Sequence, residues 1–189
     1  MPAFFKENNM ELSEVIKNRK SIRKFKDKEI PHDAIEKIVN LARFTPSWKN
    51  TQIVRVNIVE DKDVISKIAN ECNYNFKYNI PTFLNASALC VLSYIKGISG
   101  YDKDGSFSTT KEDRWEMFDS GMFAMNFELL CLDEGIGTCT IGYFDEPKLI
   151  NLLNLGDNVG IGCIIAMGYP DEEPSARPRK EVSELLKYV

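Results

Sequence analysis

The sequence has a single histidine, which limits the metal and acid–base sites that it can build. Its one histidine, His32, falls at the expected start of a helix and has no obvious serine or cysteine partner, so histidine catalysis has no support. None of the five cysteines forms a Cys-x-x-Cys pair, and with a single histidine no plausible zinc site can be assembled. We therefore expect all the cysteines to be small buried hydrophobic residues. They are Cys72, Cys90, Cys131, Cys139 and Cys163.

Both common phosphate-binding fingerprints are missing as well. There is no Walker A motif. Gly135-Ile136-Gly137 is followed by Gly142 at the wrong spacing for a Gly-x-Gly-x-x-Gly motif, and it comes after a helical pattern rather than after a first strand. A Rossmann dinucleotide site is therefore not expected. Paired-carboxylate hydrolysis has no support beyond ordinary surface Asp and Glu.

An excess of positive charge and long hydrophobic runs are also missing. The net charge of −4 argues against a general nucleic-acid or membrane-surface binder. No apolar run reaches membrane-spanning length, so no membrane segment is expected. Met1–Asn9 is too short and too polar for a signal peptide, and an odd cysteine count is typical of reduced thiols. We therefore expect a cytoplasmic protein.

Length and periodicity predict a single layered domain. A chain of 189 residues with 43% hydrophobic content can bury the core of one domain, residues 1–189, and has no linker long enough to divide it. Strands between helices predict a layered α and β fold. The expected strands are Val54–Val59, Ala86–Ile95, Thr138–Ile141 and Val159–Met167. The expected helices are Met10–Arg19 capped by Asn9, 31–43, one starting at Asp61 to Asp63, Glu112–Glu134, and 147–153 capped by Asp145.

The remaining stretches have less regular patterns. We expect residues 73–79 to be irregular and residues 96–110 to form a long loop, of the kind that often makes the lid or rim of a site. The Glu112–Glu134 helix is apolar around most of its circumference and should be buried on more than one side, for example against another subunit. Residues 171–189 are charged and contain prolines, so they should extend along a surface.

A cluster of cations follows the first predicted helix. Arg19, Lys20, Ser21 and Arg23 combine cationic side chains with a hydroxyl, a donor set suited to a phosphate or an anionic ring edge. If the helical turn persists, Arg19 and Arg23 share one face. The alternative interpretation is a solvated helix end, because cations favour the C-terminus of a helix.

Four later motifs favour a ligand site over a solvated helix end. They are Pro46-Ser47-Trp48-Lys49-Asn50-Thr51-Gln52, Asn79 before Pro81, Gly137-Thr138-Cys139-Thr140-Ile141-Gly142-Tyr143-Phe144, and Arg177-Pro178-Arg179. In this order, and with a long helix that ends in Gly-x-Gly, the motifs resemble those of the FMN-dependent nitroreductase family from about residue 11 onward. The chain departs from many relatives at Ile53-Val54 and Thr82, and its 96–110 region is short.

The resemblance implies a fold and an assembly. The fold is α+β, a nitroreductase-like three-layer sandwich with a central mixed β-sheet flanked by helices. The assembly is a homodimer through the long central helix, with residues 171–189 as a C-terminal extension that wraps the partner subunit. Two FMN molecules would lie at the dimer interface, each contacted by both chains.

The resemblance also assigns roles to individual residues. Arg19 and Ser21 match phosphate contacts, with Lys20 beside them, and Arg177 or Arg179 matches a late phosphate cation. Arg23 and Asn79 match contacts to the flavin pyrimidine. Pro46, Ser47 and Asn50 match the loop that reaches the flavin from the other subunit, and the backbone of Ile141, Gly142 and Tyr143 matches the segment near flavin N5.

The activity implied is hydride transfer from NADH or NADPH through flavin N5 to a nitroaromatic, quinone or similar planar acceptor, by a ping-pong mechanism. FMN carries this chemistry, so no catalytic side chain is expected. Trp48, Phe107 and Tyr143 are candidates for the acceptor slot, with core packing as the alternative for each. Other flavin chemistry on this scaffold (a dehalogenase or a peptide dehydrogenase), a flavin carrier or sensor, and an unrelated anion-binding module remain alternatives.

Overall fold

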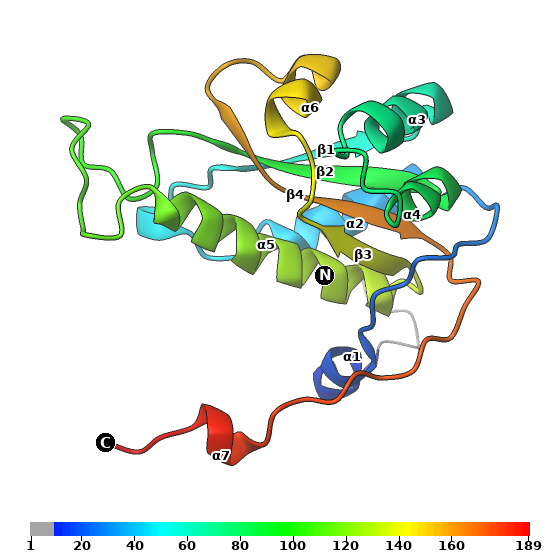
Figure 1. The fold of residues 1–189 in the computed structure, drawn as a ribbon. Coiled ribbons are helices and arrows are strands. Elements are labelled where there is room, and N and C mark those ends of the chain that lie inside the picture. The colour runs from blue at the N-terminus through cyan, green and yellow to red at the C-terminus, as the bar shows by residue number, and fades with distance from the viewer. Residues whose placement is uncertain (1–9) are drawn as a thin grey trace, which may run out of the picture.

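One four-stranded sheet forms the centre of the computed structural model, which describes residues 10–189 (Figure 1). Asn9, the predicted helix cap, lies outside the described residues. The strands are β1 (Val54–Val59), β2 (Ala88–Ile95), β3 (Gly137–Ile141) and β4 (Val159–Gly168). Their order is β1-β2-β4-β3, and every neighbouring pair is antiparallel. All four strands lie where the apolar runs predict them.

Helices flank this sheet on both sides, and two of them begin at the aspartates that the sequence marks as caps. They are α1 (Leu12–Asn18), α2 (His32–Ala42), α3 (Lys62–Glu71), α4 (Ile80–Asn85), α5 (Arg114–Asp133), α6 (Glu146–Leu153) and α7 (Val182–Leu185), with a 3-10 turn at Trp48–Asn50. The carboxylate of Asp61 accepts hydrogen bonds from the first amides of α3, and that of Asp145 accepts one from Lys148 in α6.

Helix α4 was not predicted from the sequence. Pro81 suggested a break before the next strand, but a proline is tolerated in the first turn of a helix, where its missing N–H has no partner to lose. The short helix therefore fits between Asn79 and Ala86, and β2 starts two residues later than expected.

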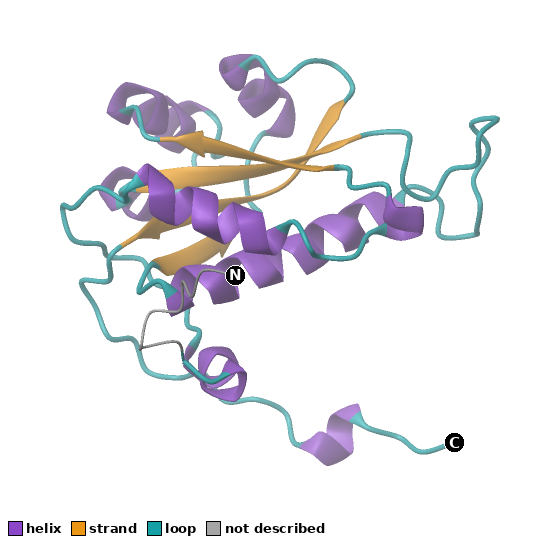
Figure 2. Cartoon of the chain, turned by 180° about the vertical axis from the view of Figure 1, so that it is seen from behind, coloured by secondary structure: helices purple, strands orange, loops and turns teal. Residues whose placement is uncertain are grey.

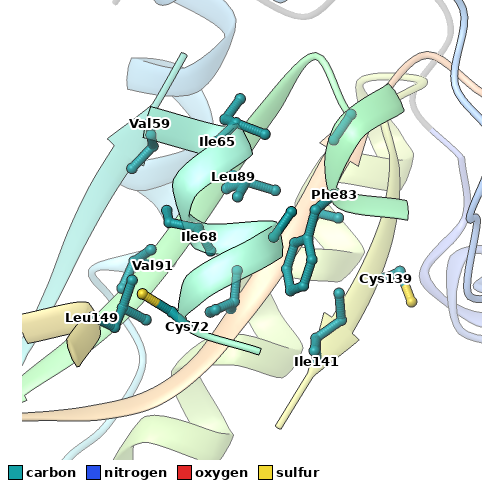
Figure 3. Packing of buried hydrophobic residues seen from close by; sticks show 14 of the residues in the cluster. Val59, Ile65, Ile68, Cys72, Phe83, Leu89, Val91, Cys139, Ile141 and Leu149 are labelled. Carbon is teal, nitrogen blue, oxygen red and sulfur yellow. The ribbon is translucent and has the colours of Figure 1, made fainter. Parts of the chain in front are cut away.

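Two apolar clusters fill the spaces on either side of the sheet. Alternate residues of β2 face opposite sides, so Leu89 and Val91 join one cluster while Cys90 and Leu92 join the other. Helices α3, α4 and α6 cover the first side, whose packing Figure 3 shows around Phe83. Helices α2 and α5 cover the second side. This arrangement is the predicted three-layer sandwich, and all five cysteines are buried in it.

The segment before α2 extends the sheet beyond β3. Ser21 forms a parallel bridge with Thr138, and the N–H of Ile22 donates to the Thr138 carbonyl at 2.8 Å. The mixed character predicted for the sheet therefore reduces to this one parallel bridge, because its four strands are all antiparallel. The bridge places the residues around Ser21 along the free edge of β3.

Two parts of the described chain are exposed to solvent. On α5, the side chains of Met117, Phe118 and Met125 are exposed in the single chain, so burial of this side against another subunit stays a prediction. Residues 175–189 are exposed and leave the body as an arm that carries α7 (Figures 1 and 2). No helix among the described residues is long and apolar enough to cross a membrane.

Tyr94 gives the fold a dependence on alkaline pH. Its ring lies over Gly160 on the neighbouring strand, where a Cβ atom would sit 2.3 Å from the ring, and burial raises the pKa of Tyr94 from 10.0 to about 12. Between these two values the unfolded phenol ionises while the folded one keeps its proton. Stability should therefore be unaffected below pH 10 and fall above it, by on the order of 2 kcal/mol in total.

We expect Tyr94→Phe to remove this part of the alkaline loss. Urea unfolding at about pH 9 and about pH 11 measures it as the difference between variant and wild type. Tyr188→Phe is the matched control, because Tyr188 is 88% exposed. Equal alkaline loss in the wild type and in Tyr94→Phe would contradict the assignment.

Candidate cofactor site

The cations predicted to bind phosphate lie along the edge of β3. We call residues 19–23 the basic edge. Helix α1 ends at Asn18, and Arg19 already has an extended conformation (ψ 121°), so Arg19 and Arg23 do not share a helical face as the sequence suggested. The chain instead turns to run beside β3, where the Ser21 bridge to Thr138 fixes its register. Tertiary pairing, rather than helix geometry, brings these donors together.

Arg19 is held by a buried carboxylate that the sequence did not single out. Its Nη1 lies 3.4 Å from Oε2 of Glu128 on α5, a residue only 7% exposed. The same carboxylate accepts a hydrogen bond from Thr138 Oγ1 at 3.3 Å and another from Thr140 Oγ1. One end of the Arg19 guanidinium is thus fixed, while its side chain stays 22% exposed.

Acidic residues after β4 approach the basic edge from the other side. The backbone N–H of Arg23 donates to Glu172 Oε1 at 2.5 Å, and Lys20 pairs with Glu173. A cavity of about 250 Å³ lies between these groups, and it is lined by Asn18, Arg19, Lys20, Ile22, Leu132, Ile136, Gly137, Thr138, Pro170, Glu172 and Glu173. Glu173 is 86% exposed, so its pairing with Lys20 can yield to a stronger anion.

Arg23 also lies within reach of the β3 strand. Burial raises the pKa of the Cys139 thiol, and the positive charge of Arg23 opposes that rise. Cys139 is 4% exposed and remains a buried neutral thiol. The basic edge therefore presents Arg23 beside the strand that leads to Ile141 and Gly142.

The second predicted motif, residues 46–52, forms a strained loop. Lys49, Asn50 and Gln52 have φ values of 46°, 58° and 52°, in the left-handed region that non-glycine residues avoid. Ser47 Oγ accepts a hydrogen bond from the Gln52 N–H at 2.9 Å, which closes the loop on itself. Asn50 is exposed, so its side chain is available to a ligand or a partner chain.

A second strained loop, residues 73–79, lies beside Tyr143. Tyr74 and Asn75 have φ values of 43° and 57°. The rings of Tyr74 and Phe76 lie 5.5 Å and 5.1 Å from that of Tyr143. The sequence marked this stretch only as irregular, although its alternation of asparagine and aromatic residues was visible. Asn79, at the end of the loop, is half-buried.

Backbone strain and unpaired buried polar atoms both occur in the 46–52 and 73–79 loops. Five of the seven described non-glycine residues with positive φ lie in them. All three buried side-chain polar atoms without a partner in the described part of the chain also lie in them, namely Trp48 Nε1, Thr51 Oγ1 and Asn73 Oδ1. Backbone strain and unpaired buried polar groups concentrate at functional sites. Both signs fit loops that complete their contacts with a group from outside the chain.

The two halves of the candidate site lie at different ends of α5. The 46–52 loop is held at Asp119, whose carboxylate oxygens both lie 3.1 Å from the Trp48 amide nitrogen, whereas the basic edge is held at Glu128. These residues are nine positions apart, which is about 13 Å along a helix. Within one chain the 46–52 loop therefore does not join the basic edge.

The residues expected to line an acceptor slot are not brought together within one chain. Trp48 stacks on Trp115 at 4.5 Å, Phe107 pairs with Tyr101 at 4.9 Å, and Tyr143 joins the 73–79 loop. Of the other predicted residues, Pro46 and Gly142 are exposed and Ile141 is buried. Among the described residues, Arg179 donates hydrogen bonds to the carbonyls of Arg177 and Pro178 in the arm.

The fold and the candidate site together indicate what kind of ligand would fit. An α+β sandwich with a cationic strand edge, two strained loops and a long helix with an open apolar side is suited to binding an anionic, planar cofactor. The profile of the nitroreductase family matches residues 16–169. The chain therefore belongs to the nitroreductase family, a family of flavin-dependent oxidoreductases.

Individual relatives agree with this assignment. A protein of Archaeoglobus fulgidus named as a putative NADH dehydrogenase/NAD(P)H nitroreductase is 28% identical over 167 residues, covering 86% of this chain and 87% of the relative. A nitroreductase family protein from Clostridium novyi NT superimposes with a TM-score of 0.74 at 31% identity, covering 86% of this chain and 87% of the other. An FMN-dependent nitroreductase from Clostridium difficile R20291 gives a TM-score of 0.69 at 24% identity, covering 90% and 92%.

Arg19→Ala should destabilise the cofactor-free protein, because it leaves Glu128 buried without its cation. We expect a loss of about 2 kcal/mol, less than for a fully buried pair because Arg19 is partly exposed. Adding Glu128→Gln to the Arg19→Ala variant should restore more than half of the lost stability. Urea unfolding of the two single variants and the double variant measures the coupling.

Lys17→Ala is the control for this cycle. Lys17 pairs with Glu14 on the surface of α1, where both side chains are more than half exposed, so its loss should cost well under about 1 kcal/mol. A double variant at Arg19 and Glu128 that loses the sum of its single losses would show that the two side chains are not coupled.

Proposed function

We propose that the chain is an FMN-dependent, NAD(P)H-consuming oxidoreductase that acts as a homodimer on planar acceptors. When bound, FMN would supply the redox chemistry, taking hydride from NADH or NADPH and passing it to a nitroaromatic, quinone or similar acceptor in a ping-pong cycle. The strongest support beyond family membership is the coincidence of strain and unpartnered polar atoms in the 46–52 and 73–79 loops. Both loops carry residues that the family resemblance assigns to the flavin.

The basic edge supplies what a phosphate dianion requires. Arg19, Lys20 and Ser21 offer guanidinium, ammonium and hydroxyl donors, and charge-assisted hydrogen bonds of this kind are the strong ones. Arg19 is already oriented by Glu128, so fewer rotamers are lost when an anion binds to its free side. Arg177 or Arg179 would complete the phosphate contacts from the C-terminal arm of either chain.

The remaining assigned groups would hold the flavin ring system. The Arg23 guanidinium would stabilise negative charge at the pyrimidine edge, where Asn79 would donate or accept a hydrogen bond. Gly142 carries no side chain and no atom within 4 Å of its Cβ position, so a planar ring can approach the backbone there. The exposed ring of Tyr143 would border the acceptor position.

A dimer would bring the two halves of the site together. The exposed Met117, Phe118 and Met125 make the outer side of α5 an apolar surface, which is suited to burial against a second copy. Because the 46–52 loop and the basic edge lie at different ends of α5, a partner helix of opposite direction would place the loop of one chain at the basic edge of the other. Residues 171–189 would then extend over the partner.

The first test is a spectrum of the purified protein after addition of FMN, followed by anaerobic addition of NADH and then NADPH. We expect the flavin absorption to shift on binding and to bleach with at least one donor. Bound flavin that neither donor reduces would favour a carrier or sensor. No binding of FMN would refute the proposed function.

Phosphate recognition can be tested without redox chemistry. In a Glu128→Gln background, which limits the folding penalty, Arg19→Ala should weaken FMN binding by about ten- to a hundredfold, because a charge-assisted contact is lost. Riboflavin, which lacks the phosphate, is the matched ligand, and its binding should change by less than about threefold. Equal losses for both ligands would exclude Arg19 as a phosphate contact.

Subunit complementation tests whether both chains build each site. A variant weakened at the basic edge and the variant Asn50→Ala should each bind FMN poorly as homodimers. Refolding an equal mixture should restore about a quarter of the tight sites, since half the dimers are mixed and each has one intact site. No recovery on mixing, with dimers confirmed by light scattering, would mean that each site belongs to one chain. Mixing two basic-edge variants is the control.

A further inference from the structure

Asp119 is a buried carboxylate in the first half of α5. It is 1% exposed, and no lysine, arginine or histidine of the described residues forms an ion pair with it. Its oxygens instead accept hydrogen bonds from the Trp48 backbone N–H, at 3.1 Å to each oxygen, and from Ser99 Oγ at 2.5 Å. A carboxylate buried without a cation is unfavourable unless such donors satisfy it.

The Trp48 amide is the point at which the strained 46–52 loop meets α5. The other backbone bonds of this loop are internal, from Asn50 to Ser47 and from Thr51 to Trp48. Its remaining attachments are the contact between the Trp48 and Trp115 rings, the hydrogen bond from Arg55 Nη1 to the Gln52 carbonyl, and exposed contacts of Lys49 with Asp102 and Ser108. Residues with positive φ persist only where the surroundings enforce them. Asp119 supplies the buried, charge-assisted part of that enforcement.

The same carboxylate fixes the beginning of the 96–110 segment through Ser99. One turn earlier on α5, Glu116 accepts a hydrogen bond from the Gly97 N–H at 2.6 Å. Glu116 is 5% exposed and is hydrogen-bonded to the 96–110 segment. No hydrogen bond among the described residues joins it to the 46–52 loop. Asp119 and Glu116 are therefore suited to comparison, because both are buried carboxylates on α5.

We propose that Asp119 is a positioning residue, which sets the conformation of the 46–52 loop and thereby presents Ser47 and Asn50 to the cofactor. This inference rests on the proposed function for the identity of the ligand, but the hold of Asp119 on the loop stands on the hydrogen bonds alone. The carboxylate accepts from the Trp48 and Ser99 donors together, whereas an alanine side chain offers no acceptor to either. Asp119→Ala should therefore release the 46–52 loop from α5.

The two tryptophans of the chain are Trp48 and Trp115, whose rings lie 4.5 Å apart at 40°, so near-ultraviolet circular dichroism reports directly on this loop. We expect Asp119→Ala to lose most of the tryptophan signal and to bind FMN about tenfold more weakly, with far-ultraviolet dichroism unchanged. Glu116→Ala should keep the tryptophan signal and bind FMN within about twofold of wild type.

If Asp119 had only a structural role, the variants at Asp119 and Glu116 would both lose stability but would bind FMN with equal affinity. This result would overturn the proposal. So would an unchanged tryptophan signal in folded Asp119→Ala. Should that variant not fold, hydrogen exchange of the wild-type protein decides. The Trp48 amide should be protected as strongly as the α5 amides, and exchange at the rate of an open loop would overturn the proposal. If wild type binds no FMN, the proposed function fails, while the dichroism and exchange results still judge the hold of Asp119.

Discussion

Buried carboxylates must be met by hydrogen-bond donors, and on α5 this requirement organises both ends of the candidate site. Asp119 draws in the 46–52 loop, and Glu128 draws in Arg19 and the threonines of β3. Because both carboxylates stand on one helix, the distance between the two loops they hold is set by helix geometry. Helix α5 therefore acts as a rigid support, and its buried side carries Glu116, Asp119, Ser120 and Glu128.

The outer side of the same helix has the opposite character. Apolar side chains such as Phe118 and Met125 face solvent, while three buried polar atoms in the 46–52 and 73–79 loops have no partner among the described residues. Apolar exposure and unsatisfied polar atoms are both unfavourable in an isolated chain. The cofactor and the second subunit that we propose would relieve both.

Much of the fold could be predicted because its signals are local. Apolar runs between turn residues gave the four strands, and capping aspartates gave the starts of α3 and α6. Helix α4 was missed because a proline serves equally as a breaker and as a first-turn residue, and only its surroundings decide between them. The end of α1 was placed too late because the pairing of Ser21 with Thr138 overrides local helix preference.

The sequence by itself determined the family, the four strands and the chemical character of the basic edge, since motif order and hydrophobic periodicity are properties of the chain alone. Only the tertiary structure showed that Glu128 holds Arg19, that Asp119 holds the strained loop, and that Tyr143 joins Tyr74 and Phe76. These contacts join residues far apart in the sequence, and no local pattern encodes which acid will be buried beside which donor. Burial turns an ordinary carboxylate into an organising group, and burial is decided by the packing of the whole chain.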